Sequence, residues 1–212
     1  MSEPFSSLIT ELDASIAIIR FNRPAERNPL SLATLSELRE SFSAMAADSN
    51  VEAIIFSGTD DVFASGADIR QLTTLDSSSA LEFSKTGQEL FQTIANTAQL
   101  TIAAINGYCM GGALDLALAC DIRIASANAV FAHPGARLGI ITGWGGTQRL
   151  PRLIGKARAL EFFATARRLS SQEALEMGLI SNICDPVLEC ALKTVREVSQ
   201  KIRAPNLTSA PL

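Results

Sequence analysis

The chain has 212 residues, of which 47% are hydrophobic and 19% are charged, as is typical of a globular protein with a substantial core. Its net charge of −4 argues against a nucleic-acid partner, since the sequence gives no indication of a broadly basic face. Apolar stretches end well before the roughly 18 residues that indicate a membrane span, and the N-terminus lacks the pattern of a secretory signal peptide. We therefore expect a cytoplasmic protein with no membrane partner.

Apolar periodicity predicts strands that alternate with helices, which is the pattern of an α/β fold. In chain order we predict a strand at 15–21, an amphipathic helix at 31–47, a strand at 51–57 and a helix at 80–98. The stretch 102–121 then supplies a strand and a helix, and short strands follow at 122–125 and 129–132. The segment 73–79 is rich in Thr and Ser, so we expect it to be the most mobile part.

The last third of the chain is predicted to be mainly helical. Helices are expected at 145–154, 157–165, between Ser170 and Gly178, and at 186–202. Pro151 should kink or break the first of these helices, while Ser170 opens a capping box. All four cysteines, Cys109, Cys120, Cys184 and Cys190, lie in apolar runs without metal-ligand spacing, so we expect them to be reduced core residues. A single histidine excludes a histidine-rich metal site, and we expect no metal.

Two turns rich in small residues each lead from a strand into a helix. The first runs from Ser65 through Gly66 and Ala67 to Asp68, where small residues let a ligand approach the backbone and Asp68 opens a short helix. The second delivers the glycine pair before Ala113 to the first turn of a helix, whose free N–H groups and positive dipole end favour an anion. Asp115 lies about one helical turn beyond Gly112, so we expect its carboxylate and the Gly112 N–H to face the same spot. Two backbone donors aimed at one oxygen form an oxyanion hole, which stabilises an enolate or a tetrahedral oxyanion.

Together and in this order, the two turns resemble the crotonase superfamily, also called the enoyl-CoA hydratase/isomerase superfamily. The resemblance runs from 8 to 203 and includes the segments Asn22-Arg23-Pro24, Gly145-Gly146-Thr147-Gln148-Arg149-Leu150-Pro151 and Ala174-Leu175-Glu176-Met177-Gly178-Leu179-Ile180. It implies the α/β crotonase-like (ClpP/crotonase) fold, a spiral of ββα units with short surrounding helices. It divides the chain into an acyl-CoA-binding domain at 1–203 and an irregular tail at 204–212.

The resemblance also implies a site for an acyl-CoA thioester and no cofactor other than the coenzyme A of that substrate. The thioester oxygen would lie between the N–H groups of Ala67 and Gly112. The adenine end of CoA would pack near Ser65, Ala67, Asp68 and Ile69, and Arg27 in the loop 25–28 would approach a phosphate. Members of the family usually continue for further helices that cover the pocket and build a trimer. We therefore expect a homotrimer or a dimer of trimers, with a lid from another subunit or none.

The carboxylates depart from the pattern of the family's hydratases, which hold a water between two glutamates. Asp115 takes the first position and is one methylene shorter than glutamate. The second position falls on Gly135, and the position of an acid found in other members falls on Gly143, so neither can transfer a proton. Gly135 is then expected to leave space for the acyl group. Trp144 is expected in the pocket wall or the core.

Three functions stay open on these residues. The leading one is an enoyl-CoA hydratase or isomerase in which Ala67 and Gly112 stabilise an enolate and Asp115 moves the proton. The second is a CoA-thioester decarboxylase or hydrolase, since His133 and the segment 143–147 are similar to those of decarboxylating members. The third is a non-catalytic acyl-CoA-binding or assembly protein. Asp115 would then only complement the helix dipole, and His133 would be a hydrogen-bonded structural residue.

Overall fold

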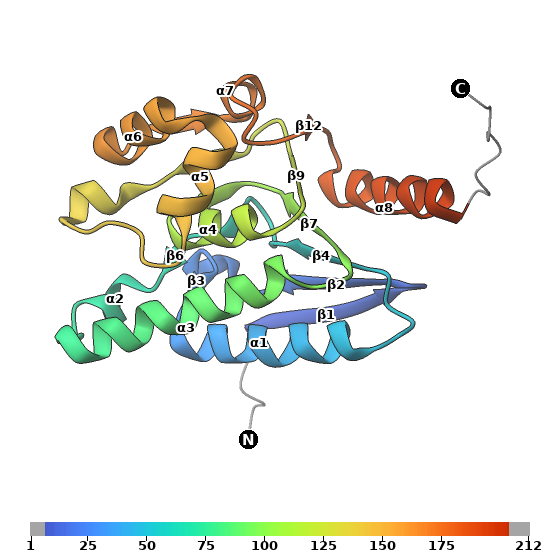
Figure 1. Ribbon diagram of the computed structural model, residues 1–212, viewed down its shortest axis with the longest axis horizontal. Helices are drawn as coiled ribbons and strands as arrows, with labels where there is room; N and C mark the ends of the chain where they lie inside the picture. The colour runs from blue at the N-terminus through green and yellow to red at the C-terminus, as the bar shows by residue number, and fades with distance from the viewer. Residues whose placement is uncertain (1–6, 204–212) are drawn as a thin grey trace, which may run out of the picture.

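The computed structural model describes residues 7–203, and its strands form three sheets (Figure 1). The largest sheet has the order β1-β2-β4-β7-β9-β12, with bounds Leu8–Asp13, Ile16–Phe21, Ala53–Ser57, Leu100–Ile105, Ile122–Ala125 and Asn182–Ile183. The second sheet has the order β11-β10-β8-β5, with bounds Arg168–Ser170, Val130–Ala132, Tyr108–Met110 and Val62–Ala64. The third pairs β3 (Pro29–Leu30) with β6 (Gly66–Ala67). β1 and β2 form an antiparallel hairpin, whereas β2, β4, β7, β9 and β12 are parallel neighbours.

The chain passes repeatedly from the large sheet to the second sheet and then into a helix. β4 leads to β5, β7 to β8, and β9 to β10. The helices have the bounds α1 Leu32–Ala47, α2 Ile69–Leu72, α3 Ser77–Ala95, α4 Gly112–Ala119, α5 Gly146–Ile154, α6 Lys156–Thr165, α7 Ser171–Glu176 and α8 Val187–Arg203. Short 3-10 turns lie at Pro24–Glu26 and Pro134–Leu138. The predicted spiral of ββα units with surrounding helices is therefore confirmed.

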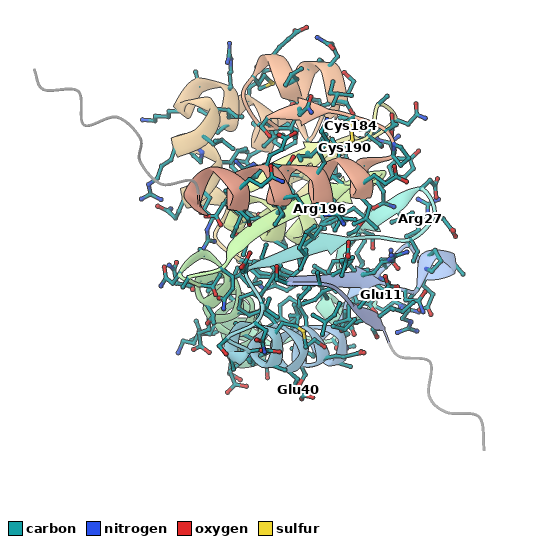
Figure 2. The ribbon with its side chains drawn as sticks, turned by 90° about the vertical axis from the view of Figure 1, so that its right-hand side faces the viewer. Glu11, Arg27, Glu40, Cys184, Cys190 and Arg196 are labelled. Atoms are coloured by element: carbon teal, nitrogen blue, oxygen red, sulfur yellow. A yellow bond between two sulfur atoms is a disulfide. The ribbon has the colours of Figure 1, made fainter. Side chains whose placement is uncertain are left out.

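The central strands β4 and β7 are buried on both faces, which explains why they read as continuous apolar runs. In β4, Ile54 and Phe56 enter the main core with residues of α1, α3 and α4, whereas Ala53 and Ile55 point to the other face. That other face is covered by Val187 and other apolar residues of α8, which lies across the sheet in Figure 2. No helix in the described part of the chain is long and apolar enough to span a membrane.

Local sequence signals account for most helix boundaries. Ser31 caps α1 by accepting a hydrogen bond from the N–H of Thr34 at 3.1 Å, and Ser170 and Glu173 form the predicted capping box of α7. Pro151 is predicted to kink or break α5, and a break does not occur, because α5 continues to Ile154 and ends only at Gly155. Leu150 and Ile154 are buried against the core on either side of the proline and hold the helix there. The tail predicted at 204–212 lies outside the described residues.

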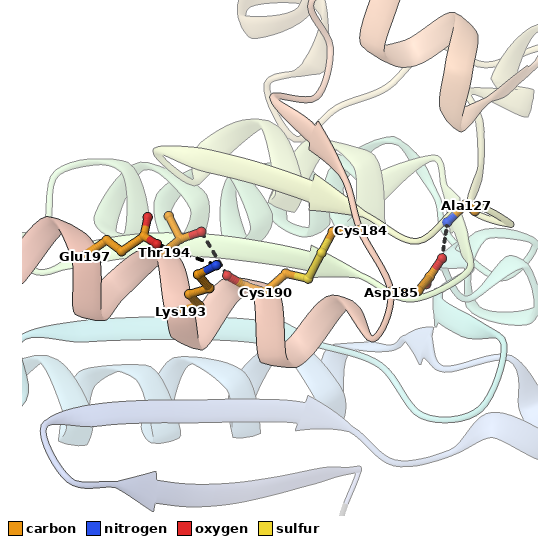
Figure 3. Close-up of a disulfide and its surroundings, with 7 residues drawn as sticks. All are labelled: Ala127, Cys184, Asp185, Cys190, Lys193, Thr194 and Glu197. Carbon is orange, nitrogen blue, oxygen red and sulfur yellow. Dashed lines mark hydrogen bonds and ion pairs between the residues drawn. A yellow bond between two sulfur atoms is a disulfide. The ribbon is translucent and has the colours of Figure 1, made fainter.

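The prediction of four reduced core cysteines is wrong for Cys184 and Cys190, which form a disulfide (Figure 3). The bond joins the end of β12 to the first turn of α8 across a Cα–Cα distance of 6.4 Å. Both residues are half-buried and lie on either side of the bend at 185–186, and their apolar neighbours do not indicate the pairing. Cys109 and Cys120 are free and buried as predicted. Burial raises the pKa of the Cys120 thiol to about 12, as is typical of an inert thiol.

Candidate active site

Two predicted backbone donors, the N–H groups of Ala67 and Gly112, lie next to each other. Ala67 ends β6, and Gly112 is the first residue of α4, where helix N–H groups have no partner within the helix. A Cβ atom on Gly112 would lie 3.5 Å from the Ala67 nitrogen, and one on Gly66 would lie 2.8 Å from the Gly112 nitrogen. Gly66 also has a φ of +87°, which favours glycine. The two glycines are therefore what allows these backbone segments to approach.

A cavity of about 300 Å³ opens beside these two N–H groups, and we call it the acyl cavity after the group that the family resemblance implies for this place. Its walls are mainly apolar and come from α2, α3, α4 and the loop before α5. The residues that line it are Ala67, Leu72, Leu75, Ala80, Phe83, Ser84, Gly112, Gly135, Ile140, Ile141, Thr142, Gly143 and Trp144. None of these lining residues carries an ionisable side chain, so a ligand there meets little polar surface besides the backbone and the hydroxyls of Ser84 and Thr142.

Trp144 forms a wall of the acyl cavity and is also part of the core, as predicted. Its indole Nε1 donates a hydrogen bond to the carbonyl of Phe83 at 3.1 Å, and the side chain is buried. Its ring packs against the rings of Phe83 and Phe91, with centroids 5.0 and 5.7 Å apart. A Cβ atom on Gly112 would lie 2.3 Å from the indole, so the ring covers the first turn of α4 directly.

Asp115 is fully buried, and both of its carboxylate oxygens have partners. His133 Nε2 lies 3.2 Å from Oδ1, and the Thr142 hydroxyl donates a hydrogen bond to Oδ2. A Cβ atom on Gly146 would collide with Oδ1, so the carboxylate also touches the first turn of α5. Burial lowers the pKa of the nearby Arg149 guanidinium below its usual value, and the negative charge of Asp115 offsets part of this effect. The sequence predicts that Asp115 faces the same spot as the Gly112 N–H. In the structure Gly112 lines the acyl cavity but Asp115 does not, and Thr142 lies there instead.

Both glycines at the expected positions of a second acid line the acyl cavity, but their surroundings differ. A Cβ atom on Gly135 would lie 2.6 Å from the carbonyl oxygen of Ile140, whose own N–H donates to the Gly135 carbonyl at 3.0 Å. A side chain at Gly135 would therefore require the backbone at Ile140 to shift. A Cβ atom on Gly143 would meet only the Ser84 side chain, at 2.9 Å from its hydroxyl.

Of the residues predicted to contact CoA, Ala67 lines the acyl cavity and the other four lie outside it. Arg27 and Ile69 are exposed, whereas Ser65 and Asp68 are half-buried. Ser65 N–H donates to the carbonyl of Arg27 at 3.0 Å, which joins the loop that carries Arg27 to the segment before β6. Arg27 lies at the rim of the molecule in Figure 2, and Ile69 is 54% exposed. Asp68 caps α2 and pairs with Arg70 at 3.0 Å, and the hydrogen bond from that guanidinium holds the pKa of the Asp68 carboxyl below its usual value.

Two residues of this region are not found by sequence reasoning. Thr142 contacts Asp115 across 27 residues of chain, and nothing in its neighbours Ile141 and Gly143 signals that contact. Arg70 follows Asp68 by two residues, a spacing at which a helix-capping aspartate pairs with a basic side chain. Within residues 7–203, no three His, Cys, Asp or Glu side chains gather where they could hold a metal ion.

Comparison with known proteins connects this geometry to a family. The family model for enoyl-CoA hydratase/isomerase matches residues 11–209. Crotonyl-CoA hydratase of Syntrophomonas wolfei is 38% identical over 93% of this chain and 76% of its own length, and short-chain-enoyl-CoA hydratase of Clostridium acetobutylicum is 35% identical over 93% and 75%. Among solved structures, Pseudomonas aeruginosa DspI has a TM-score of 0.88 at 32% identity, covering 94% of this chain and 82% of that one. Enoyl-CoA hydratase from Bacillus anthracis has a TM-score of 0.87 at 34% identity, covering 91% and 76%. The chain therefore belongs to the enoyl-CoA hydratase/isomerase family of the crotonase superfamily, and is an enzyme of this hydratase/isomerase type.

Proposed function

We propose that the protein binds a short acyl-CoA thioester and holds its carbonyl oxygen between the N–H groups of Ala67 and Gly112. The observation that carries this proposal is the contact between these two backbone segments at the wall of an uncharged cavity. Backbone donors fixed in such a site stabilise the enolate oxygen that develops in the transition state. Removal of one donor typically costs about 2.7 to 4 kcal/mol of transition-state stabilisation. A cavity of about 300 Å³ is at the lower end of ligand pockets and suits a small acyl group.

Movement of a double bond from the 3 to the 2 position is the reaction that the site supports best. The reaction removes a proton from the α carbon and returns one at the γ carbon, so a single proton carrier can serve both steps. Asp115 is that carrier in our proposal. Hydration needs a held and activated water as well, and neither Gly135 nor Gly143 can supply a group for it. Two relatives are named hydratases, and this favours hydration as an additional reaction of the same site.

Decarboxylation of a malonyl-type thioester is a second candidate, favoured by the lack of ionisable side chains among the residues that line the acyl cavity. Loss of CO₂ leaves an enolate directly, so it needs the two backbone donors but no base. An apolar cavity also disfavours the charged carboxylate of the substrate relative to the spread charge of the transition state.

The CoA part of the substrate is assigned to the surface beside β6. Arg27 is exposed next to Ser65, and a guanidinium is well suited to bind a phosphate. Ile69 offers exposed apolar surface nearby for the adenine ring, since it is 54% exposed. Asp68 is tied to Arg70, so its part is to fix the start of α2 rather than to contact an anion.

The test is an incubation of the purified protein in D₂O with crotonyl-CoA, a 3-enoyl-CoA and an alkylmalonyl-CoA, followed by mass spectrometry. The same incubations are made with the Asp115→Asn variant. Double-bond movement or hydration that is lost in the variant supports the leading proposal, whereas loss of CO₂ that persists in the variant moves the assignment to decarboxylation. Binding of the thioesters without any reaction would identify a non-catalytic acyl-CoA-binding protein and overturn the proposal.

A further inference from the structure

Thr142 lies where three cavities meet. It lines the acyl cavity, an apolar cavity of about 230 Å³ that also includes His133 and Phe163, and a polar cavity of about 600 Å³ that includes Gln88 and Arg149. Its side chain is half-buried, and its hydroxyl donates to Asp115 Oδ2. This hydroxyl is thus the polar group through which the buried carboxylate adjoins the substrate's space.

The carboxylate of Asp115 is enclosed by protein groups. His133 meets Oδ1, the first turn of α5 lies against the same oxygen, and Thr142 meets Oδ2. Its exposed fraction is 0%, and it is not among the residues that line any of the three cavities. A substrate in the acyl cavity therefore reaches the Thr142 hydroxyl before it reaches the carboxylate.

We propose that Thr142 is a catalytic residue whose hydroxyl relays the proton between the substrate and Asp115. This inference rests on the proposed function. A threonine hydroxyl has one proton to donate and two lone pairs to accept with. The Thr142 hydroxyl donates its proton to Asp115. The backbone N–H of Trp144 lies 3.5 Å from the Thr142 oxygen, which is long for a hydrogen bond. One lone pair of that oxygen can therefore accept a proton from a substrate in the acyl cavity.

The relay balances in both halves of the double-bond movement. In the first half, the α proton of the thioester passes to Thr142 Oγ1 while the hydroxyl's own proton passes to Asp115 Oδ2. The electron pair of the C–H bond becomes the enolate, whose oxygen is held by the N–H groups of Ala67 and Gly112. In the second half, Asp115 returns its proton to Thr142, and Thr142 gives a proton to the γ carbon. Both residues end the cycle as they began.

His133 is a positioning residue in this arrangement, because it acts on the substrate only through Asp115. Its imidazole is buried and packs edge-on against Phe163, with ring centroids 5.1 Å apart. It thereby fixes Oδ1 and leaves Oδ2 directed at Thr142.

The test compares Thr142→Val, which keeps the shape of the side chain and removes the hydroxyl, with Thr142→Ser, which keeps the hydroxyl. Two rates are measured: turnover of a 3-enoyl-CoA, and exchange of the α protons of saturated butyryl-CoA with D₂O. We expect Thr142→Val to lower kcat and the exchange rate about 100-fold or more, with KM within about twofold, as for loss of a general acid–base group. Thr142→Ser should recover most of both rates.

A proton inventory provides the readout that a structural role would not affect. In mixtures of H₂O and D₂O, the rate of the wild-type protein should depend on the deuterium fraction with a curvature that reports two protons in flight. The residual rate of Thr142→Val should depend on it linearly. Thermal melting and butyryl-CoA affinity of the variants establish that they are folded and bind.

Each outcome has a distinct meaning. A Thr142→Val protein as active as wild type, or a Thr142→Ser protein as impaired as Thr142→Val, overturns the relay and leaves the proposed function standing. A wild-type protein that neither turns over nor exchanges protons overturns the proposed function and the relay together.

Discussion

His133 Nε2 lies 3.2 Å from Oδ1 of Asp115, and both side chains are buried. A buried carboxylate needs hydrogen-bond partners, and among residues 7–203 this contact is one of two that side chains make to Asp115. The two residues are 18 positions apart and come from α4 and the turn after β10, so they connect α4 to the loop that lines the acyl cavity. We expect the orientation of Asp115, and with it proton transfer, to depend on His133.

Replacement of His133 tests this dependence. A hydrogen bond to a charged group contributes about 1.5 to 3 kcal/mol, so we expect His133→Leu to lower kcat roughly 10- to 150-fold, with a small change in KM. His133→Gln keeps a polar group at this position and should retain more activity. Phe163→Leu is the matched control, because Phe163 packs against the imidazole and its side chain has no group that can hydrogen-bond to the carboxylate. Equal activity in the Leu and Gln variants would contradict a role for the contact.

The fold was largely predictable because its signals are local. The apolar runs of β4 and β7, the cap at Ser31 and the capping box at Ser170 can each be read within a few residues. The strand at Leu8–Asp13 could not be predicted in this way, because four of its six residues are exposed and it forms only by pairing with β2. The disulfide joins Cys184 and Cys190 across the bend at 185–186, and no local pattern around either residue indicates this pairing.

The site divides in the same way. Ala67, Gly112 and Asp115 follow from glycine placement and helical spacing, whereas the contacts of Asp115 with His133 and Thr142 join residues 18 and 27 positions apart. Such contacts depend on how α4 and the loop before α5 pack together. A sequence pattern within either segment contains no information about that packing.

The Gly112 N–H can be removed by proline, which is accepted at the first position of a helix. Because any Cβ at Gly112 would collide with Trp144, the substitution is best made in a Trp144→Ala background. We expect Gly112→Pro to lower kcat/KM a further 10²- to 10³-fold relative to Trp144→Ala alone, as for loss of one oxyanion donor. Steady-state kinetics on the single and double variants measure this difference. Equal kcat/KM in the two proteins would show that the N–H has no part in catalysis.

Alanine at Gly135 and at Gly143 should have different effects on stability. At Gly135 the new methyl group would lie 2.6 Å from the backbone oxygen of Ile140, and we expect a loss of about 1 to 3 kcal/mol, as for overpacking. At Gly143 it would meet the Ser84 side chain, 2.9 Å from the hydroxyl. Rotation of that hydroxyl would break only its exposed hydrogen bonds with the Gly143 carbonyl and Gln88, so the loss should be smaller. Urea unfolding of both variants tests the comparison, and a more stable Gly135→Ala than Gly143→Ala would refute it. On the same ground, Gly143→Glu is the substitution that can restore a second acid.

The cap of α3 predicts a pH-dependent contribution to stability. Hydrogen bonds from the backbone and hydroxyl of Ser79 to Asp76 lower the pKa of the Asp76 carboxyl from 3.8 to about 2. Because the folded-state pKa is the lower one, the contribution is complete above pH 4 and disappears as the pH falls toward 2. The unfolding free energies of wild type and Asp76→Ala should therefore differ at pH 7 and converge between pH 4 and 2. A difference that stays constant over this range would contradict the prediction.

Reduction of the disulfide should lower stability without changing activity. Cys184 and Cys190 are separated by six positions, and closing so short a loop stabilises a fold by about 2 kcal/mol in the chain-entropy account. The bond anchors α8 to the face of the large sheet opposite α4, away from the acyl cavity. We therefore expect dithiothreitol to shift the urea midpoint downward and to leave kcat/KM unchanged. The Cys184→Ser/Cys190→Ser double variant should have the urea midpoint of the reduced wild-type protein and should not respond to dithiothreitol. If dithiothreitol does not change the midpoint of the wild-type protein either, the disulfide contributes nothing to stability.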